Sequence, residues 1–306
     1  MPVALHSRRG MPQICVAGMA ACAVIGAAAS NGACPGQVPP VEAPEIPLHE
    51  SRPAHWLTVG IDAVTVYQFR GFVYEDSGPI VQPWAEVDLT VLETDSAAIR
   101  LLLSTWHSFH GQATDAESQD GFRRHWFEAD ASAGIGADLG PWNVTAQYNV
   151  YTSPSDAWPT MQEVSFNLSY ADDWLPAGWS LNPHALLAFE VGPAANDGMR
   201  NGVFLELGVS PTYEFTDGPC AGVMLSFPIA LGLSLSNYYE DDEGRNDAFG
   251  YVSLGAGATI PLGRTGPANW SLSLGIEALM LGGAAASFND GERSVLVGSI
   301  GLVMEF

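Results

Sequence analysis

The sequence contains no lysine, and its basic side chains are 11 arginines against 34 aspartates and glutamates. The formal net charge of −23 is strongly negative for a chain of 306 residues. Proteins that bind nucleic acids neutralise phosphates with Lys and Arg, so this composition excludes a nucleic acid as partner. The same balance suits a surface or a pore that meets cations, although acidity also serves solubility alone.

Cysteine is also scarce, with four in the whole chain. Cys15 and Cys22 lie in a segment that we expect to be removed, which leaves Cys34 and Cys220 far apart in the sequence. Two isolated thiols match no metal-binding or redox motif, so we expect no cofactor. An oxidising compartment would allow a disulfide between Cys34 and Cys220, tying the N-terminal tail to the base of the fold.

Long apolar runs are missing except near the N-terminus. Residues 14–29 are apolar and small, follow the basic stretch Ser7-Arg8-Arg9, and end in the small-residue pattern Ala27-x-Ala29. This order of regions predicts a signal peptide over residues 1–29, with a lipoprotein signal as the alternative. No other stretch has the length and apolarity of a membrane-spanning helix. The rest of the chain is therefore either a soluble domain or a membrane-spanning β-barrel.

The composition changes again at Trp56. Residues 30–55 are rich in proline and acids, which is typical of an extended, here periplasmic, tail. Residues 56–306 consist of short segments in which apolar and polar side chains alternate, as in β-strands with two different faces. We expect an all-β domain of about twelve strands, near residues 56–70, 80–92, 97–107, 122–138, 141–152, 160–172, 178–191, 202–215, 220–237, 247–261, 269–282 and 294–306.

Alternation alone also fits a soluble sandwich or barrel with an apolar interior, but three features favour a transmembrane antiparallel β-barrel. The expected strands are long enough to cross a bilayer at a tilt. Short and long connections alternate, which separates periplasmic turns from external loops when the N-terminus is periplasmic. Aromatic residues gather near strand ends, where interfacial girdles belong; they include Trp56, Tyr67, Trp142, Trp179, Tyr213 and Trp270.

The last eight residues carry the most specific local signal. Ser299, Gly301, Met304 and the terminal Phe306 follow the pattern of a polar residue, a glycine and alternating hydrophobic residues that ends in an aromatic. This resembles the assembly signal of outer-membrane barrels and implies the barrel-assembly machinery as a partner. The alternative is an ordinary last strand that happens to end in Phe.

Two further segments resemble a known family. Residues 61–72, IDAVTVYQFRGF, followed by Pro79-Ile80-Val81-Gln82-Pro83, look like the opening of the TorF-type porins, which carry a Tyr-x-Phe/Trp-Arg-Gly core on their first strand. Residues 249–255, FGYVSLG, are similar to a later part of that family. The resemblance implies a porin-like outer-membrane barrel and little about its solute. The Pro-rich tail and the strong acidity depart from the family.

If the apolar strand faces meet lipid, the other faces line the lumen. The acids on these faces are Asp62, Glu86, Asp88, Glu128, Asp130, Glu163, Glu190, Glu206, Glu214, Glu277 and Glu305. The basic residues on these faces are Arg70, Arg100 and Arg124. So few arginines cannot pair with all the acids, and dry unpaired carboxylates are costly, so we expect a wet, narrow, cation-favouring lumen. The alternative is a plugged barrel whose acids share protons or bind divalent cations.

Arg70 has two interpretations. It ends the first expected strand and would pair with Glu86 or Asp88 on the second, either as a constriction of the pore or as a structural pair at the rim. The segment 238–247, YYEDDEGRND, is acidic enough for weak divalent-cation binding but lacks the spacing of an EF-hand. A solvated external loop is the simpler interpretation.

Catalysis has one candidate set, because some barrels of this size hydrolyse lipids. Ser180, Asn182 and His184 alternate on one face of the seventh strand, but they share it with Glu190, and no nucleophile-elbow or metal spacing accompanies them. We therefore expect no enzyme.

The sequence thus predicts a porin-like channel in a Gram-negative outer membrane, for passive diffusion of small solutes with a preference for cations. Its surroundings would be outer-membrane lipids and lipopolysaccharide. The main alternative is a non-conducting barrel with a structural or surface-binding role, and a lipid hydrolase comes third.

Overall fold

The computed structural model describes residues 56–306 except 114–120, 197–198 and 242. The predicted signal peptide and tail, and with them Cys34, lie outside the described residues. No helix in the described part of the chain is both long and apolar enough to cross a membrane.

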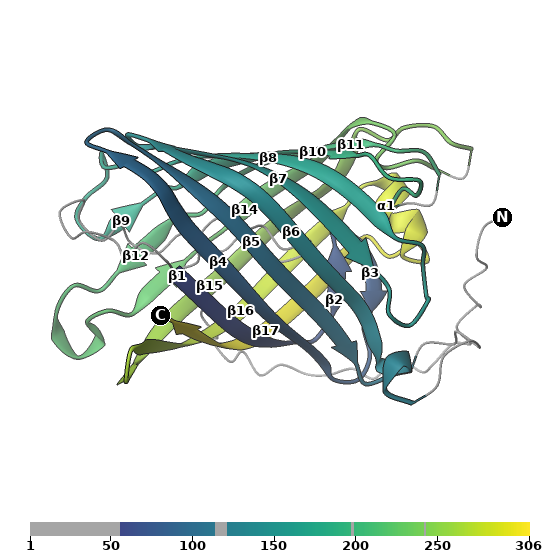
Figure 1. The fold of residues 1–306 in the computed structure, drawn as a ribbon. Helices are drawn as coiled ribbons and strands as arrows, with labels where there is room; N and C mark the ends of the chain where they lie inside the picture. Colours follow the sequence, from purple (N-terminus) through teal and green to yellow (C-terminus); the bar gives the residue numbers. More distant parts are fainter. Residues whose placement is uncertain (1–55, 114–120, 197–198, 242) are drawn as a thin grey trace.

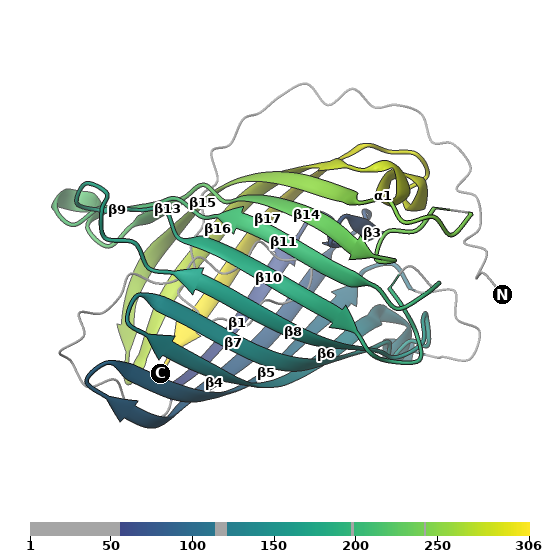
Figure 2. The same ribbon diagram turned by 90° about the horizontal axis from the view of Figure 1, so that it is seen from above.

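Twelve antiparallel strands close into a barrel, as the sequence predicted (Figure 1). Nine of them are continuous: β1 (Trp56–Val64), β4 (Ile80–Thr94), β5 (Ala97–His110), β6 (Trp126–Leu139), β7 (Trp142–Thr152), β8 (Met161–Tyr170), β15 (Phe249–Thr265), β16 (Ala268–Leu281) and β17 (Ser294–Glu305). The last strand pairs with the first, from Thr58 opposite Glu305 to Val64 opposite Ser299, and this pairing closes the barrel. Figure 2 shows that the strands run obliquely to the long axis of the barrel.

The other three strands are each broken in two. They consist of β9 (Trp179–Ser180) with β10 (Pro183–Glu190), β11 (Val203–Val209) with β12 (Thr212–Glu214), and β13 (Met224–Ser226) with β14 (Ile229–Ser236). Pro211 and Pro228 lie in two of the breaks and have no N–H to donate to the ladder. Asn182, with φ of 50°, lies in the third. The wall stays bonded across the breaks, because Ser210 N–H donates to Leu181 O at 2.9 Å and Phe227 N–H donates to Pro211 O at 2.8 Å.

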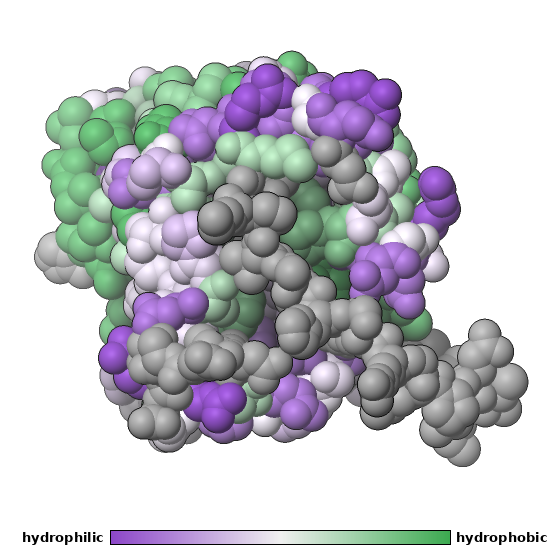
Figure 3. All heavy atoms as spheres, turned by 90° about the vertical axis from the view of Figure 1, so that its right-hand side faces the viewer, coloured by the Kyte–Doolittle hydropathy of each residue, from purple (hydrophilic) through white to green (hydrophobic). Residues whose placement is uncertain are grey.

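The two ends of the barrel differ in the length of their connections. Tight turns join β4 to β5, β6 to β7 and β15 to β16, and the chain ends at Phe306 on the same side. The opposite end carries the long loops, among them 65–79, 191–202, 237–248 and 282–293. Because short turns are periplasmic and long loops external in outer-membrane barrels, we call the second end the outer end. Figure 3 views this outer end, where hydrophilic residues gather on the rim and hydrophobic residues on the sides.

Burial follows the predicted alternation. On β5, Leu101 and Leu103 are 38% and 43% exposed, whereas Leu102 between them is 5% exposed. The exposed apolar side chains form the outer surface of the strands, and they include Ile61, Ile135, Val144, Phe166, Leu168, Leu207, Leu254, Ile276, Leu296 and Ile300. An apolar exterior and a polar interior are the opposite of a soluble barrel and fit a barrel that crosses a lipid bilayer.

The first strand departs from its predicted length. The sequence predicted a strand over 56–70, but β1 ends at Val64. The chain then enters the barrel as a separate hairpin of β2 (Tyr67–Phe69) and β3 (Phe72–Glu75), which form their own two-stranded sheet. Tyr67, predicted at a membrane interface, is 3% exposed in this hairpin. Alternation continued from β1 into β2, so the periodicity alone did not mark the end of the transmembrane strand.

Three short helices complete the described part of the fold. They are the 3₁₀ helices η1 (Gly121–His125) and η2 (Gly218–Cys220) and the α-helix α1 (Gly283–Phe288). In α1, Ala284, Ala285 and Ala286 are buried. Asp247 accepts a hydrogen bond from the N–H of Ala284 at 3.1 Å, which holds the start of α1.

The lipid-facing assignment leads to a test at Leu103, which lies midway along β5. Leu103→Arg should lower the free energy of unfolding by about 2–4 kcal/mol, because a cation then faces the bilayer centre. Val91, which is 63% exposed near a short turn, provides the control, and Val91→Arg should cost about 0–1 kcal/mol. Urea titration of barrels in lipid vesicles measures both. Equal effects at the two positions would contradict the assigned depth.

Candidate functional site: the lumen and its inserted hairpin

The hairpin turns sharply at Arg70 and Gly71. Their φ angles are 49° and 88°, so both central residues of this two-residue turn are left-handed, as in the primed turns that match strand twist. Glycine adopts this conformation freely, but an arginine there is uncommon. The contacts of Arg70 explain its position, since the turn aims its side chain at the far wall.

Arg70 and Glu163 form a buried ion pair inside the barrel. The Arg70 Nη1 lies 2.6 Å from Glu163 Oε2 and its Nη2 lies 3.0 Å from Glu163 Oε1. The two side chains are 7% and 3% exposed, so water does not screen the pair. Tyr238 Oη accepts a further bond from Nη1 at 3.0 Å, and the guanidinium lies 4.3 Å from the ring centroid of Phe204. This bidentate geometry offsets the cost of desolvating both charges.

The hairpin crosses the lumen. It starts from β1, whereas Glu163 is on β8 and Phe204 on β11, which lie on the opposite side of the ring of strands. The sequence predicted that Arg70 pairs with Glu86 or Asp88 on the neighbouring strand, and this is wrong. A partner 93 residues away cannot be read from local register, because it depends on where the loop folds.

External loops hold the hairpin from other sides. Asn289, after α1, accepts a hydrogen bond from Val73 N–H at 2.8 Å and donates one to Gly71 O at 2.7 Å, as a neighbouring strand would. Tyr239 donates to Arg70 O at 2.8 Å, and Tyr74 donates to Asn196 Oδ1 at 2.8 Å. Three loops thus bind one inserted hairpin.

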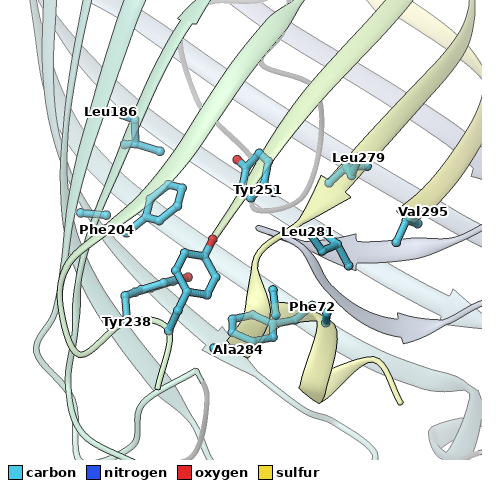
Figure 4. Close-up of a cluster of buried hydrophobic side chains, with 13 residues drawn as sticks. Phe72, Leu186, Phe204, Tyr238, Tyr251, Leu279, Leu281, Ala284 and Val295 are labelled. Atoms are coloured by element: carbon cyan, nitrogen blue, oxygen red, sulfur yellow. The ribbon is translucent and has the colours of Figure 1, made fainter. Parts of the chain in front are cut away.

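Hydrophobic side chains fill the space around the hairpin. On one side Phe72 packs in a cluster with Tyr238, Tyr239, Tyr251 and the alanines of α1 (Figure 4). A second cluster on the other side of the hairpin comprises Tyr67, Ile80, Trp84, Trp106, Phe127 and Val303. The outer part of the lumen is therefore packed with protein, whereas the sequence had predicted a wet lumen without a filled plug.

The predicted lumen acids lie on inner strand faces, and several bond neutral donors. Trp84 Nε1 donates to Asp62 at 2.8 Å, and Tyr67 and Tyr251 donate to Glu128 and Glu206. Glu190 instead accepts backbone N–H bonds in its loop, from Asn196 and Gly202, each at 2.7 Å. The remaining acids, Glu86, Asp130, Glu214, Glu277 and Glu305, are buried or half-buried on β4, β6, β12, β16 and β17.

The other two arginines predicted for the lumen lie in different places. Arg100 on β5 is 4% exposed and pairs with Asp88 and with Asp138, the latter at 3.1 Å. Asp138 was missed because it falls near the end of its strand, although its spacing from Asp130 puts it on the same face. Arg124 lies in η1, since β6 begins only at Trp126, and it is not on the inner face of a strand.

The possible hydrolase residues do not form a catalytic arrangement in the described structure. His184 Nδ1 lies 3.1 Å from the carbonyl oxygen of Asn182, and no hydrogen bond between His184 and Ser180 occurs among the described residues. The amide of Asn182 donates to Ser210 O at 3.0 Å. The Asn182 side chain therefore joins the break in the seventh transmembrane strand to the break in the eighth.

Two arginines pair with three of the acids in the external loop. Arg245 lies 2.7 Å from Asp241 and 2.8 Å from Glu243, and Arg200 pairs with the buried Glu240. Hydrogen bonds from the backbone and side chain of Arg245 lower the pKa of Asp241. Within the described residues, no group of three or more His, Cys, Asp or Glu side chains is arranged to hold a metal ion.

The predicted assembly-signal residues lie at the closing strand. Ser299 and Gly301 face inward on β17, while Phe306 is 38% exposed and donates its N–H to Leu57 O at 2.9 Å. A Cβ at Gly301 would lie 2.0 Å from Asp62 Oδ1, so this glycine makes room for the Asp62–Trp84 bond. Met304 is half-buried on the other face. Their part in assembly stays a prediction, and so does the Cys34–Cys220 disulfide, of which only the exposed Cys220 is described.

Comparison with known proteins yields fold likeness only. No family model matches the chain, and no curated protein matches it, so membership of the TorF-type porins is not shown. The COG4313 outer membrane channel from Pseudomonas putida F1 matches with a TM-score of 0.49 and 10% identity, over 86% of this chain and 100% of that one. The NanC porin has a TM-score of 0.43 and 9% identity, over 81% and 98% of the two chains.

LpxR from Salmonella typhimurium matches with a TM-score of 0.42 and 8% identity, over 80% of this chain and 99% of that one. At such values these likenesses carry no argument about function. The closed barrel and its apolar exterior are themselves the architecture of bacterial outer-membrane proteins, and they place the chain in the outer membrane.

The buried ion pair can be tested by removing one charge. Glu163→Gln should lower the free energy of unfolding by about 3–5 kcal/mol, because it leaves the Arg70 guanidinium buried without its counter-charge. Glu243→Gln, at the exposed ion pair with Arg245, is the matched control and should cause no comparable loss. Urea unfolding in lipid vesicles measures the difference. Equal stabilities of the two variants would show that the pair does not hold the hairpin.

Proposed function

We propose that this chain is a narrow outer-membrane channel for small solutes, in which the β2–β3 hairpin forms the constriction and the lumen favours cations. The observation that carries the proposal is the hairpin itself. A loop that leaves the rim, crosses the lumen and is bound at its tip sets the width of any path through the barrel. The polar inner faces of the strands below it supply the rest of that path.

The charge of the inner faces supports a preference for cations. Among the described residues, two arginines face the lumen: Arg70 pairs with Glu163, and Arg100 pairs with Asp88 and Asp138. Glu206 accepts a hydrogen bond from the uncharged hydroxyl of Tyr251, and Glu277 is half-buried on β16. An excess of carboxylates along a pore lowers the energy of a cation there and raises that of an anion.

Ion selectivity is the first test. In a planar bilayer with a salt gradient, the barrel should give a reversal potential whose sign shows that cations are more permeant than anions. The double variant Glu206→Gln/Glu277→Gln should reduce the cation-to-anion permeability ratio by about twofold, because it removes two lumen carboxylates. Glu243→Gln, in the external loop, is the control for a change in charge outside the lumen. An anion preference of the unaltered barrel would overturn the cation proposal.

Conductance is the second test. Replacing residues 66–76 by a short Gly-Ser linker should increase single-channel conductance severalfold, because the hairpin no longer crosses the lumen. Arg245→Ala, which removes ion pairs in an external loop, should leave the conductance unchanged. A deletion variant that folds but conducts no better than the unaltered barrel would show that the hairpin is not the constriction.

A non-conducting barrel with a structural or surface-binding role is the second candidate, and the filled outer lumen favours it. The same recordings separate the two candidates. A channel conducts with its hairpin in place, whereas a non-conducting barrel carries current only after the hairpin is deleted. Heat-modifiable migration on gels confirms for each variant that the barrel has closed.

A further inference from the structure

A ladder of aromatic rings lies on the lipid-facing side of β5 and β6 at the outer end. Phe109 and Trp126 stack with centroids 5.6 Å apart, and His107 contacts Trp126 edge-on at 5.4 Å. Phe122 extends the ladder, 5.4 Å from Phe109, and is 67% exposed. A phenylalanine so exposed next to other rings leaves an apolar surface that the described protein does not cover.

The position of the ladder follows from the strand alternation. Trp106 and Ser108 are buried on the inner face of β5, so His107 and Phe109 point outward, in line with Leu101 and Leu103. In Figure 1, η1 is the short teal helix beyond the ends of β5 and β6, at the end of the barrel that carries the long loops. Aromatic rings at this level lie at the boundary between acyl chains and headgroups.

Two adjacent arginines accompany the rings. Arg123 and Arg124 follow Phe122 in η1 and are the only adjacent arginines in the described part of the chain. Arg123 is exposed and, like Arg264 and Arg293, forms no ion pair with any described residue, whereas Arg70, Arg100, Arg200 and Arg245 pair with acids. The two neighbouring guanidinium groups are donors that an anion at the rim can use.

We propose that η1 and the rings beside it bind a lipopolysaccharide molecule of the outer leaflet through its lipid-borne phosphates. Arg123 and Arg124 would bind the phosphate oxygens, for which the guanidinium fork is suited. Phe122 and Trp126 would pack against the first carbons of the acyl chains and the sugar ring. A free phosphate uses only the arginines, so the exposed rings favour a lipid. The inference does not depend on whether the barrel conducts.

The test uses the full barrel in detergent micelles, titrated with lipopolysaccharide and followed by native mass spectrometry. Arg123→Ala/Arg124→Ala should weaken binding by about thirtyfold, given the usual contribution of a basic residue at an anionic membrane surface. Phe122→Ala should weaken it by about fivefold, since a partly exposed ring contributes less than a buried one. Heat-modifiable migration on gels checks that each variant is folded.

Matched controls come from the same chain. Arg245→Ala removes an arginine at the outer end, and Arg264→Ala removes one near a short turn. Phe227→Ala removes a phenylalanine that is 40% exposed in the break between β13 and β14. All three should bind as the unaltered barrel does. Unchanged binding in the double arginine variant, or an equal loss in the controls, would overturn the proposal. So would equal binding of dephosphorylated lipopolysaccharide, or competition by inorganic phosphate at a concentration close to that of the lipid.

Discussion

The ion pair between Arg70 and Glu163 is the interaction on which the interior of this barrel depends. It joins the tip of a loop that starts at β1 to a strand on the opposite wall, and its two charges are almost fully removed from water. A buried charge without its partner costs several kcal/mol of stability, so the loss of either residue would destabilise the fold. The tyrosines, Asn289 and the alanines of α1 then pack around a hairpin whose position this pair has fixed.

The barrel itself could be predicted from the sequence because the pattern that produces it lies within each strand. Each strand alternates apolar and polar residues with a period of two, and only two solutions satisfy that pattern, one with an apolar interior and one with an apolar exterior. The alternation of short and long connections decided between them. The transmembrane strands were predicted to within about four residues of their observed ends for this reason, except the first, which ends at Val64 and not at residue 70.

The inserted hairpin could not be predicted in the same way. The alternation of β1 continues through Tyr67, Gln68 and Phe69, so the sequence pattern predicts that these residues end a transmembrane strand. A signal was present nonetheless: Arg70-Gly71 lies between Tyr-Gln-Phe and Phe-Val-Tyr, which is the layout of a tight hairpin with aromatic arms. Its partners, Glu163, Tyr238 and Asn289, come from distant parts of the sequence, and only the closed fold brings them together. The acids predicted for the lumen lie on inner strand faces, and their part in lining a pore stays a prediction.

The location of these partners also has a consequence for the order of folding. The hairpin is synthesised early, directly after the first strand, whereas the residues that bind it belong to β8, to the loop after β14 and to the segment after α1. It can therefore dock only when nearly the whole chain has been threaded into the membrane. The pairing of β17 with β1 and the filling of the lumen are then late and coupled events, and a barrel truncated before Asn289 would lack the groups that recognise its own plug.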